Sequence, residues 1–538
     1  MSRSKLTRST SLALLPLGLS LALVDGALAQ QRPAGRPAES SAAAGEVALA
    51  VPPDTAVVTR HTGTFNGQTV RYTATAGTLP IVEDGKVRAR MFYVAYVKEG
   101  VQDVTKRPVV FSFNGGPGSA SVWMHMGYTG PKLVKYDDEG FAVIPPGGVE
   151  DNPYSILDVA DIVYIDPVAT GFSRMMPGED EHKYHGVMED IQSVGEFIRL
   201  WVTRNGRWGS PKFLIGESYG TTRAAGLANY LQSQHRMYLN GVILVSMTNL
   251  GVQAGPLVSL ATTLPHYTAT AWYHGKLPPD LQSRPLREVL DEAEKFAIGD
   301  YLLALVRGHH LQGAERQEMV RRVARYTGLS ESYVDAADLR IDLGRFRKEL
   351  LRDRRLTVGR LDSRYTGIDS DAAGERNQYD QAMSDWNGGF TTAINMYLRE
   401  TLGFKTDLEY NIFGPVNPWR GRFDTNVGQM LRRAMTDNPY LKVMVQAGYY
   451  DGGTDYFSAQ YTMSQLQPGG ELRDRIRFAF YESGHMMYLR REDLPRANQD
   501  IRDFIAWALQ GVPDYPRIPA RLSASAGSIG SAGAAGGN

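Results

Sequence analysis

Cysteine is absent from this sequence of 538 residues, and its 58 basic and 58 acidic side chains leave no formal net charge. The absence of cysteine excludes disulfide bonds, thiolate ligands for a metal and a cysteine nucleophile. A chain without an excess of either charge has no general attraction to nucleic acids or anionic membranes, and we expect neither as a partner. Long apolar runs are also scarce, because beyond the N-terminus no segment reaches the length of a membrane-spanning helix.

The N-terminus has the pattern of a secretory signal peptide. An apolar stretch at residues 12–24 follows three basic residues and precedes the small-x-small cleavage signal Ala27-Leu28-Ala29. This stretch is too short for a comfortable transmembrane helix, and an uncleaved amphipathic anchor is the alternative. We therefore predict a signal peptide at residues 1–29, cleaved near Ala29, and an exported protein that is periplasmic or secreted. A cysteine-free exported chain fits a bacterial periplasm or exterior better than a eukaryotic secretory lumen.

The rest of the chain divides by composition into a core, an insertion and two flanking segments. Residues 30–54 are rich in Ala, Pro, Gly and Ser without periodicity, which is typical of a disordered linker, and residues 517–538 form a similar predicted tail. Between them we predict a core in two parts, residues 55–255 and 416–516, separated by a helical cap insertion at residues 256–415. Apolar residues make up 43% of the sequence, which is ample for a sizeable core.

Strand and helix patterns alternate through the first part of the core. Residues 57–97 alternate apolar and polar side chains, which predicts antiparallel strands. Buried-type strands then alternate with helices, which predicts a mainly parallel central sheet covered on both faces and the α/β class. After Asn249 the pattern is mostly helical, at 256–274, 286–309, 315–326 and 330–355, before strands at 441–447 and 475–481 and a final helix at 499–509.

The pentapeptide Gly216-Glu217-Ser218-Tyr219-Gly220 lies between an apolar run and a helix-favouring run. This Gly-x-Ser-x-Gly pattern, in a strand–turn–helix context, indicates a serine nucleophile. A serine on so sharp a turn has a strained backbone, and the residues two positions away on either side must be small to avoid colliding with the turn. The turn lifts the Ser218 hydroxyl above the sheet edge and directs the first N–H groups of the next helix towards its target.

A serine hydroxyl needs a base, which is usually a histidine oriented by a carboxylate. In this topology the chain order is serine, acid, histidine, and of the ten histidines only His485 follows His310. His485 comes directly after the predicted strand at 475–481, at the carboxyl end where parallel strands place their sites. Asp451 is the first acid after the preceding strand, so we predict it as the orienting acid and expect Asp455 to serve a turn or a cap.

A tetrahedral intermediate also needs preorganised N–H donors. One donor is expected from Tyr219, directly after the nucleophile, and the other from an earlier strand-to-helix loop. Asn114-Gly115-Gly116-Pro117-Gly118 is the candidate loop, because glycine lets the backbone approach an oxyanion closely. No Gly-Lys-Ser/Thr follows, so this is not a phosphate-binding loop, and a simple tight turn is the alternative.

In combination, these motifs resemble the serine carboxypeptidase family, which has the α/β-hydrolase fold. The shared motifs occur in the family's order between Val109 and Met487: the 114–118 loop, Asn152-Pro153-Tyr154-Ser155, Asp166 through Gly171-Phe172-Ser173, the 216–220 pentapeptide and Gly484-His485-Met486. Each motif is weak by itself, but the ordered combination is highly specific.

The resemblance implies roles for particular residues. It implies Ser218, Asp451 and His485 as a catalytic triad. It implies the backbone N–H groups of Gly116 and Tyr219 as the oxyanion hole. The helical insertion would then form a cap over the cleft and shape its side-chain pockets.

The resemblance also implies that Asn114, Glu217 and the Gly115 N–H bind the terminal carboxylate of the substrate. A carboxylic acid can hydrogen-bond a carboxylate only if one of the two holds a proton, and burial beside a like charge raises the pKa of Glu217. We therefore expect peptidase activity to favour acidic pH, a requirement that esters and amides with a blocked C-terminus do not share. The alternative for Glu217 is a carboxylate bound to backbone donors, without a substrate role.

Some features depart from the family pattern. Tyr128 stands where the family typically has a second carboxylate-binding acid, and Ser112 stands where many members have tryptophan. The cysteines that cross-link eukaryotic members are missing. These departures leave the triad intact and concern the recognition of the substrate C-terminus.

We therefore expect an exported serine carboxypeptidase that acts through an acyl-enzyme on peptides with a free C-terminus, and that needs neither metal nor cofactor. An esterase or acyltransferase with the same triad is the alternative, supported by Tyr128, and a non-catalytic binding protein on the same scaffold is a third. The charged residues at 180–190 match no metal-ligand spacing. The basic run at 345–355 also contains acidic residues, so at both places we expect solvated helix surfaces.

Overall fold

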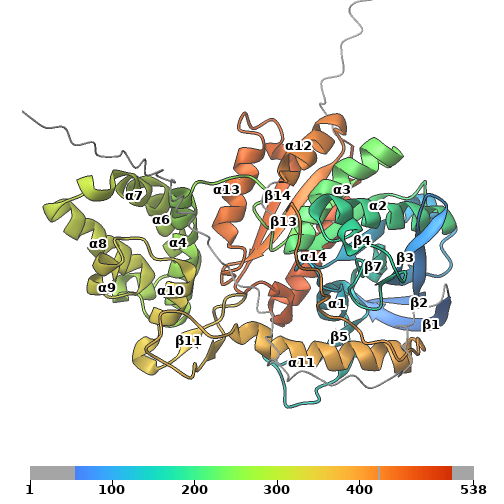
Figure 1. Ribbon diagram of the computed structural model, residues 1–538, viewed down its shortest axis with the longest axis horizontal. Coiled ribbons are helices and arrows are strands. Elements are labelled where there is room, and N and C mark those ends of the chain that lie inside the picture. The colour runs from blue at the N-terminus through green and yellow to red at the C-terminus, as the bar shows by residue number, and fades with distance from the viewer. Residues whose placement is uncertain (1–54, 422–424, 512–538) are drawn as a thin grey trace, which may run out of the picture. The chain divides into compact units, whose positions relative to one another are not determined.

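The computed structural model describes residues 55–421 and 425–511 (Figure 1). The predicted signal peptide at 1–29, the linker at 30–54 and the tail at 517–538 lie outside the described residues. Among the helices of the two described ranges, none combines the length and the apolar character needed to cross a membrane.

Long antiparallel strands open the described chain and confirm the prediction from the alternating pattern. They are β1 (Ala56–Phe65), β2 (Gln68–Glu83) and β3 (Lys86–Lys98). The two-residue turns Asn66-Gly67 and Asp84-Gly85 join them, and all four turn residues have positive φ. Asn, Asp and Gly tolerate this left-handed conformation, which matches the twist of the flanking strands.

The main path of the sheet runs β1-β2-β3-β7-β4-β9-β10-β13-β14 within the described residues, and the short β8 (Arg174–Met175) pairs with β3. From β7 onward the neighbouring strands are parallel. These strands are β4 (Val109–Phe113), β7 (Asp161–Ile165), β9 (Lys212–Glu217), β10 (Gly241–Val245), β13 (Lys442–Gly448) and β14 (Ile476–Tyr481). This arrangement confirms the predicted α/β-hydrolase fold with a mainly parallel sheet. Because these strands are parallel, their carboxyl ends share one edge of the sheet.

Helices cover both faces of the sheet. Successive side chains of a strand point to opposite faces. Accordingly, Leu214 of β9 belongs to the core under α2 (Val187–Arg204), α3 (Tyr219–His235) and α12 (Val427–Asp437). Its neighbours Phe213 and Ile215 belong to the opposite core, which includes α11 (Gln381–Met396) and α14 (Asp493–Ala508).

The residues after β10 form a separate helical group with its own hydrophobic core (Figure 1). Its helices are α4 (Pro256–Tyr273), α6 (Leu286–Phe296), α7 (Leu302–Arg307), α8 (Gly313–Thr327), α9 (Glu331–Ala336) and α10 (Leu343–Glu349). The same core includes Tyr449 and Tyr450 after β13, and Tyr456 and Phe457 at the start of α13 (Tyr456–Leu466). The helical group therefore packs on the segment that carries Asp451. The predicted boundaries of the insertion at 256 and 415 stay predictions.

Some helix predictions were wrong in detail. The predicted helix at 286–309 is interrupted by a wide turn at Ala297–Tyr301, where Gly299 has φ −101° and ψ −107°. The predicted helix at 330–355 breaks between α9 and α10. The basic run there is not wholly solvated, because the Lys348 side chain is 1% exposed and pairs with the fully buried Asp369 at 2.5 Å.

Three further helices were not predicted at their observed places. The helix α11 and the hairpin of β11 (Thr357–Val358) and β12 (Thr366–Gly367) lie in the region where the sequence predicted a mostly helical insertion with few strand signals. The helices α12 and α13 were not predicted, although Asn426 and Asp455 cap their first turns. The last helix begins at Asp493 rather than Gln499, because Pro495 falls in its first turn, where proline is tolerated.

Candidate active site

Ser218 lies at the sharp turn between β9 and α3, with φ 58° and ψ −127°. It is partly exposed, whereas Glu217 and Tyr219 on either side are buried. A Cβ on Gly216 would lie 2.1 Å from the Gly220 carbonyl oxygen, and a Cβ on Gly220 would lie 2.9 Å from the Phe113 carbonyl oxygen. The structure therefore confirms that this strained turn requires small residues on both sides of the serine.

The glycine-rich loop after β4 lies directly against this turn. A Cβ on Gly115 would lie 2.3 Å from the Tyr219 backbone nitrogen, so only glycine allows this approach. Gly116 has φ 102°, a conformation that glycine adopts without strain. The loop thus brings the backbone of Gly115 and Gly116 beside the first amide of α3, where the two oxyanion donors are expected. Their role as an oxyanion hole stays a prediction.

His485 and Asp451 are joined by a hydrogen bond. His485 Nδ1 lies 2.7 Å from Asp451 Oδ2, and the two side chains are 5% and 0% exposed. A carboxylate only accepts hydrogen bonds, so Nδ1 carries the proton and Nε2 is left as the basic nitrogen. Burial alone would lower the pKa of His485, but the Asp451 carboxylate outweighs it and the pKa lies above its usual 6.5.

Asp451 is held in its ionised form by several donors. Burial alone would raise the pKa of Asp451, but His485 and the Thr454 hydroxyl and amide lower it below the usual value. The Thr454 hydroxyl lies 2.6 Å from Asp451 Oδ2, and the Gly453 amide lies 2.8 Å from Asp451 Oδ1. These bonds fix the carboxylate where it accepts the His485 Nδ1–H, as is expected of an orienting acid.

Ser246 connects the nucleophile turn with the histidine loop. The Ser218 N–H donates to the Val245 carbonyl at 3.0 Å, and the next residue, Ser246, donates its hydroxyl to the His485 carbonyl at 2.7 Å. The Thr454 hydroxyl also lies 2.9 Å from the Ser246 carbonyl. The loops after β9, β10, β13 and β14 therefore meet at one edge of the sheet. Within the described residues, no hydrogen bond joins the Ser218 hydroxyl to His485, a contact that commonly tightens only when substrate binds.

A segment of the helical region holds the loops of Asp451 and His485 together. We call residues 360–364 the strap. The Leu361 carbonyl accepts from the His485 N–H at 2.7 Å, and the Arg360 carbonyl accepts from the Gly452 N–H at 2.9 Å. The Ser363 N–H donates to the Tyr450 carbonyl at 2.9 Å. The strap thus bonds to both loops through main-chain atoms.

A buried ion pair stiffens the strap. Arg364 lies 2.6 Å from Asp362, with side chains 1% and 2% exposed, and it reaches the Ser483 hydroxyl at 3.3 Å. A Cβ on Gly484 would lie 2.4 Å from the Asp362 Cβ, so the histidine loop fits against the strap only with glycine at this position.

Glu217 is a buried acid beside the nucleophile. Burial raises its pKa to about 7, and the nearby Asp451 charge acts in the same direction, whereas His485 and the Tyr488 hydroxyl oppose the shift. The Tyr488 hydroxyl donates to Glu217 Oε2 at 2.5 Å. Glu217 therefore holds its proton at mildly acidic pH, as an acid must if it is to hydrogen-bond another carboxylate.

Asn114 lies beside Glu217, and only the oxygen of its side-chain amide makes a hydrogen bond of good geometry within the described residues. Its Oδ1 accepts from the Met124 N–H at 3.0 Å. It approaches closely enough to lower the pKa of Glu217. However, its buried Nδ2 makes no hydrogen bond of good geometry within the described residues, so a donor is left for a further partner.

Two of the departures from the family pattern have different structural meanings. The Tyr128 hydroxyl donates to Gln446 Oε1 at 2.8 Å and to the Ala497 carbonyl at 3.1 Å, so it faces the core rather than Glu217. Ser112 is fully buried, and within the described residues its hydroxyl has no hydrogen-bond partner.

Sequence reasoning missed Tyr488, Thr454 and Ser246. The position of Ser246 directly after a strand next to the nucleophile strand is a signal that the topology rule would have given. Thr454 follows Asp451 at the spacing of a local side-chain turn. Tyr488 has no such signal, because its contact with Glu217 joins residues 271 positions apart.

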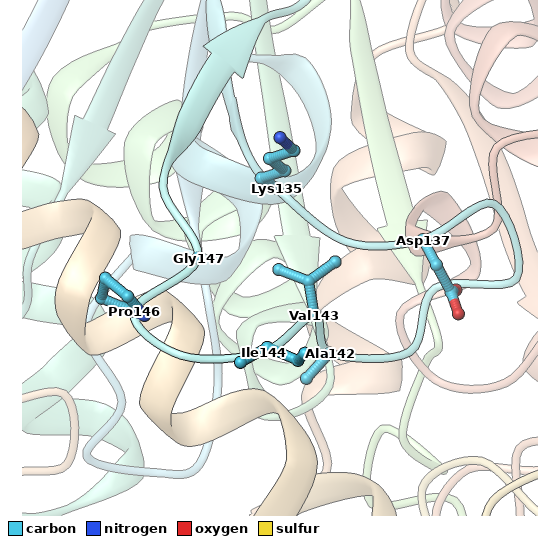
Figure 2. Close-up of a pocket in the computed structure, with 7 residues that line it drawn as sticks. All are labelled: Lys135, Asp137, Ala142, Val143, Ile144, Pro146 and Gly147. Carbon is cyan, nitrogen blue, oxygen red and sulfur yellow. The ribbon is translucent and has the colours of Figure 1, made fainter.

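Other candidate features lie apart from this site. Asp455 caps α13 through the Ser458 N–H at 2.8 Å, which confirms the expectation of a capping residue. Within the described residues, no group of three or more His, Asp or Glu side chains is placed to hold a metal ion. Figure 2 shows a surface cavity on the loop of residues 135–147, and none of the predicted site residues lines it.

Part of the chain is similar to proteins of one known family. The serine carboxypeptidase family model matches residues 66–295. Serine carboxypeptidase-like 29 of Arabidopsis thaliana is 30% identical over 132 residues, which are 24% of this chain and 25% of that protein. The chain thus spans about a quarter of the length of this curated relative.

Solved structures were also compared. The prohormone-processing carboxypeptidase KEX1(delta)p of Saccharomyces cerevisiae is 14% identical, with 81% of this chain and 91% of that chain covered and a TM-score of 0.48. A proline iminopeptidase of Mycobacterium smegmatis is 13% identical, with coverage of 80% and 98% and a TM-score of 0.34.

Proposed function

We propose that this chain is a serine carboxypeptidase that removes C-terminal residues from peptides, a proposal supported by the match of residues 66–295 to the serine carboxypeptidase family model. The observation that carries the proposal is the buried acid Glu217, next to Ser218 and beside the Nδ2 of Asn114, which makes no hydrogen bond of good geometry within the described residues. An acid that is neutral near pH 7 or below, together with a free amide donor, is suited to a substrate carboxylate. A peptide with a free C-terminus is the substrate that supplies one.

In the proposed reaction, Ser218 Oγ attacks the scissile carbonyl carbon while His485 Nε2 takes the hydroxyl proton. The Asp451 carboxylate stabilises the resulting imidazolium through Nδ1. The N–H groups of Gly116 and Tyr219 stabilise the tetrahedral oxyanion.

Collapse of this intermediate breaks the C–N bond. His485 returns the proton to the leaving amine, and the acyl group stays on Ser218. Water then attacks the acyl-enzyme with His485 as base, which releases the shortened peptide and restores the serine. The chemistry requires only these side chains and main-chain donors.

The substrate carboxylate would be bound by Asn114 Nδ2, the Gly115 N–H and protonated Glu217. Each group supplies a proton, so the negative charge is met by hydrogen-bond donors rather than by a cation. This places the scissile bond next to Ser218 and limits cleavage to the last residue. The proposal includes export of the mature chain to the periplasm or exterior, which rests on the sequence pattern of residues 1–29.

The test compares an N-blocked dipeptide with a free C-terminal carboxylate and its C-terminal amide, from acidic to mildly basic pH. We expect hydrolysis of the free acid, strongest at low pH, little hydrolysis of the amide, and no activity in Ser218→Ala. Equal hydrolysis of acid and amide would contradict carboxylate recognition.

An esterase or acyltransferase is the second candidate function. It is favoured by one observation, the Tyr128 hydroxyl that faces the core where a second carboxylate-binding acid is expected. Turnover of simple esters without any turnover of the free-acid dipeptide would support this function instead.

A further inference from the structure

The hydroxyl of Tyr488 is the closest donor to Glu217. It lies 2.5 Å from Oε2, and both side chains are buried, at 1% exposure for Tyr488 and 2% for Glu217. Tyr488 belongs to the short helical turn Met487–Leu489, three positions after His485. The same loop therefore presents both the general base and the partner of Glu217.

The ring of Tyr488 is fixed by its neighbours. It stacks on Tyr128 with ring centres 4.6 Å apart and planes at 11°. Tyr128 is itself held by Gln446 and the Ala497 carbonyl. A Cβ on Gly127 would lie 2.8 Å from the Tyr488 ring, so glycine at this position makes room for the stack. These contacts hold the ring in place while its hydroxyl donates to Glu217.

The side chains with the largest effect on the pKa of Glu217 come from four segments. They are Asn114 after β4, Asp451 after β13, His485 after β14, and Tyr488 on the following turn. Only Asp451 adds to the effect of burial and favours neutral Glu217, whereas the other three favour the ionised form. Of these, Tyr488 is the one that makes a hydrogen bond of good geometry to a named oxygen, Oε2.

We propose that Tyr488 is a positioning residue for the substrate carboxylate, because its bond to Oε2 fixes the proton of neutral Glu217 on Oε1. An oxygen that accepts a hydrogen bond from Tyr488 cannot also direct a proton along the same line, so neutral Glu217 donates from the other oxygen. The resemblance implies a second carboxylate-binding acid at position 128, but this chain has tyrosine there. Tyr488 thereby directs the proton of the single acid, Glu217, towards the substrate. This inference rests on the proposed function.

Tyr488 also sets the pH range in which the site can act. A hydrogen bond to the charged form of an acid lowers its pKa, so loss of the hydroxyl raises it. Neutral Glu217, the form that binds a carboxylate, then persists to higher pH. In Tyr488→Phe, the pH above which free-acid hydrolysis declines should therefore rise by about one to two units, given the strength of a hydrogen bond to a charged group.

The experiment measures kcat and KM against pH for wild type, Tyr488→Phe and Tyr128→Phe. The substrates are the N-blocked dipeptide acid and a matched ester without a free carboxylate. Tyr128→Phe is the control, because it keeps the stacked ring and removes a buried hydroxyl that does not touch Glu217. Only for Tyr488→Phe, and only with the free acid, we expect an upward shift of the decline together with a higher KM at acidic pH, where Glu217 is neutral in every variant.

Two results would overturn the inference. One is a decline at the same pH in Tyr488→Phe as in wild type. The other is an equal shift in both variants, which would attribute the effect to the ring stack rather than to the hydroxyl.

The inference and the proposed function can fail separately. If wild type does not prefer the free acid, the proposed function fails. The ionisation of Glu217 can still be followed by its infrared carboxyl signal, identified by difference against Glu217→Gln. If the signal titrates at higher pH in Tyr488→Phe than in wild type, the effect of Tyr488 on the ionisation of Glu217 is supported. If the signal titrates at the same pH in both, this effect is contradicted.

Discussion

At the level of single residues, the three predicted triad members differ in how firmly they are held. The Asp451 carboxylate accepts from His485, from the Thr454 hydroxyl and from two backbone amides. His485 is fixed at Nδ1 and at both its backbone N–H and its carbonyl. Ser218 is partly exposed, with a hydroxyl that can turn towards substrate. Asp451 and His485 are thus fixed in place by their hydrogen bonds, whereas Ser218 is the least constrained of the three predicted members.

Asp451→Asn tests the hydrogen bond at Nδ1. An amide in this place can donate to Nδ1 and stabilise the wrong tautomer, so kcat should fall by about ten thousandfold. The measurement uses a simple ester, which does not depend on Glu217. Asp455→Asn is the matched control, because asparagine also caps helices, and its kcat should stay close to that of wild type. Equal losses in the two variants would contradict the role of Asp451.

Glu217→Gln tests the origin of the acidic preference. In wild type, free-acid hydrolysis should fall as pH rises through about 7, because Glu217 then ionises and repels the substrate carboxylate. Glutamine keeps a donor at every pH, so this decline should vanish in the variant. The ratio of kcat/KM for the acid and the ester across pH gives the result. A decline retained in Glu217→Gln would assign it to another group.

At the level of elements, the strap joins helical residues to the two loops that carry the acid and the base. The ion pair of Arg364 and Asp362 lies beneath the His485 loop and is almost fully buried. Removal of one partner leaves an uncompensated buried charge. Replacing one partner of this ion pair should therefore destabilise the protein, whereas replacing both partners should cost much less stability.

Arg364→Met should lower the free energy of unfolding by about 3–5 kcal/mol, because Asp362 loses its counter-ion. The double variant Asp362→Asn with Arg364→Met should recover most of this loss, since no buried charge remains. Urea unfolding of the two variants and wild type measures the difference, and kcat reports whether the His485 loop has moved. A double variant no more stable than Arg364→Met would count against the ion pair as the cause.

Predictability from sequence also differs among the elements. The strands β9 and β13 were predicted because buried parallel strands appear as short apolar runs that end in turn residues, whereas β14 is a partly exposed edge strand recognised by its aromatic and β-branched residues. Ser218, Asp451 and His485 follow those strands directly, so the topology rule was enough to select them. These selections stay predictions of function, although the structure brings their loops together.

The missed features depend on contacts between distant parts of the chain. The burial of Lys348 depends on Asp369, which lies beyond a turn of the helical region. The bond of Tyr488 to Glu217 depends on the Tyr128 ring, which lies 360 positions earlier. Helix propensity and local spacing carry no information on such pairs, because tertiary packing decides them.

At the level of the whole molecule, the core of the helical group continues into the segment of Asp451 through Tyr449, Tyr450 and Tyr456. A disturbance inside the helical group should therefore reach the site through two routes, this shared core and the strap. The helix α12 belongs to another hydrophobic core, which is separate from the core of the helical group.

Hydrogen exchange tests this coupling. Leu290→Ala, at a fully buried position of α6, should cost about 2–5 kcal/mol and speed exchange of the Gly452 and His485 amides, which bond to the strap. Leu431→Ala, an equally buried leucine of α12, is the matched control and should leave these amides less affected. Identical exchange in the two variants would mean that the site does not depend on the helical group.

The strap has a consequence for how such a chain can change over evolution or in the laboratory. Its residues lie among the segments that are expected to shape substrate pockets, yet their main-chain atoms bond to the loops of Asp451 and His485. Selectivity and turnover should therefore be inherited together in this protein. A helical region transplanted from a relative would bring its own geometry for the acid and the base, and exchange of specificity would require residues 360–364 and the two loops to move as one unit.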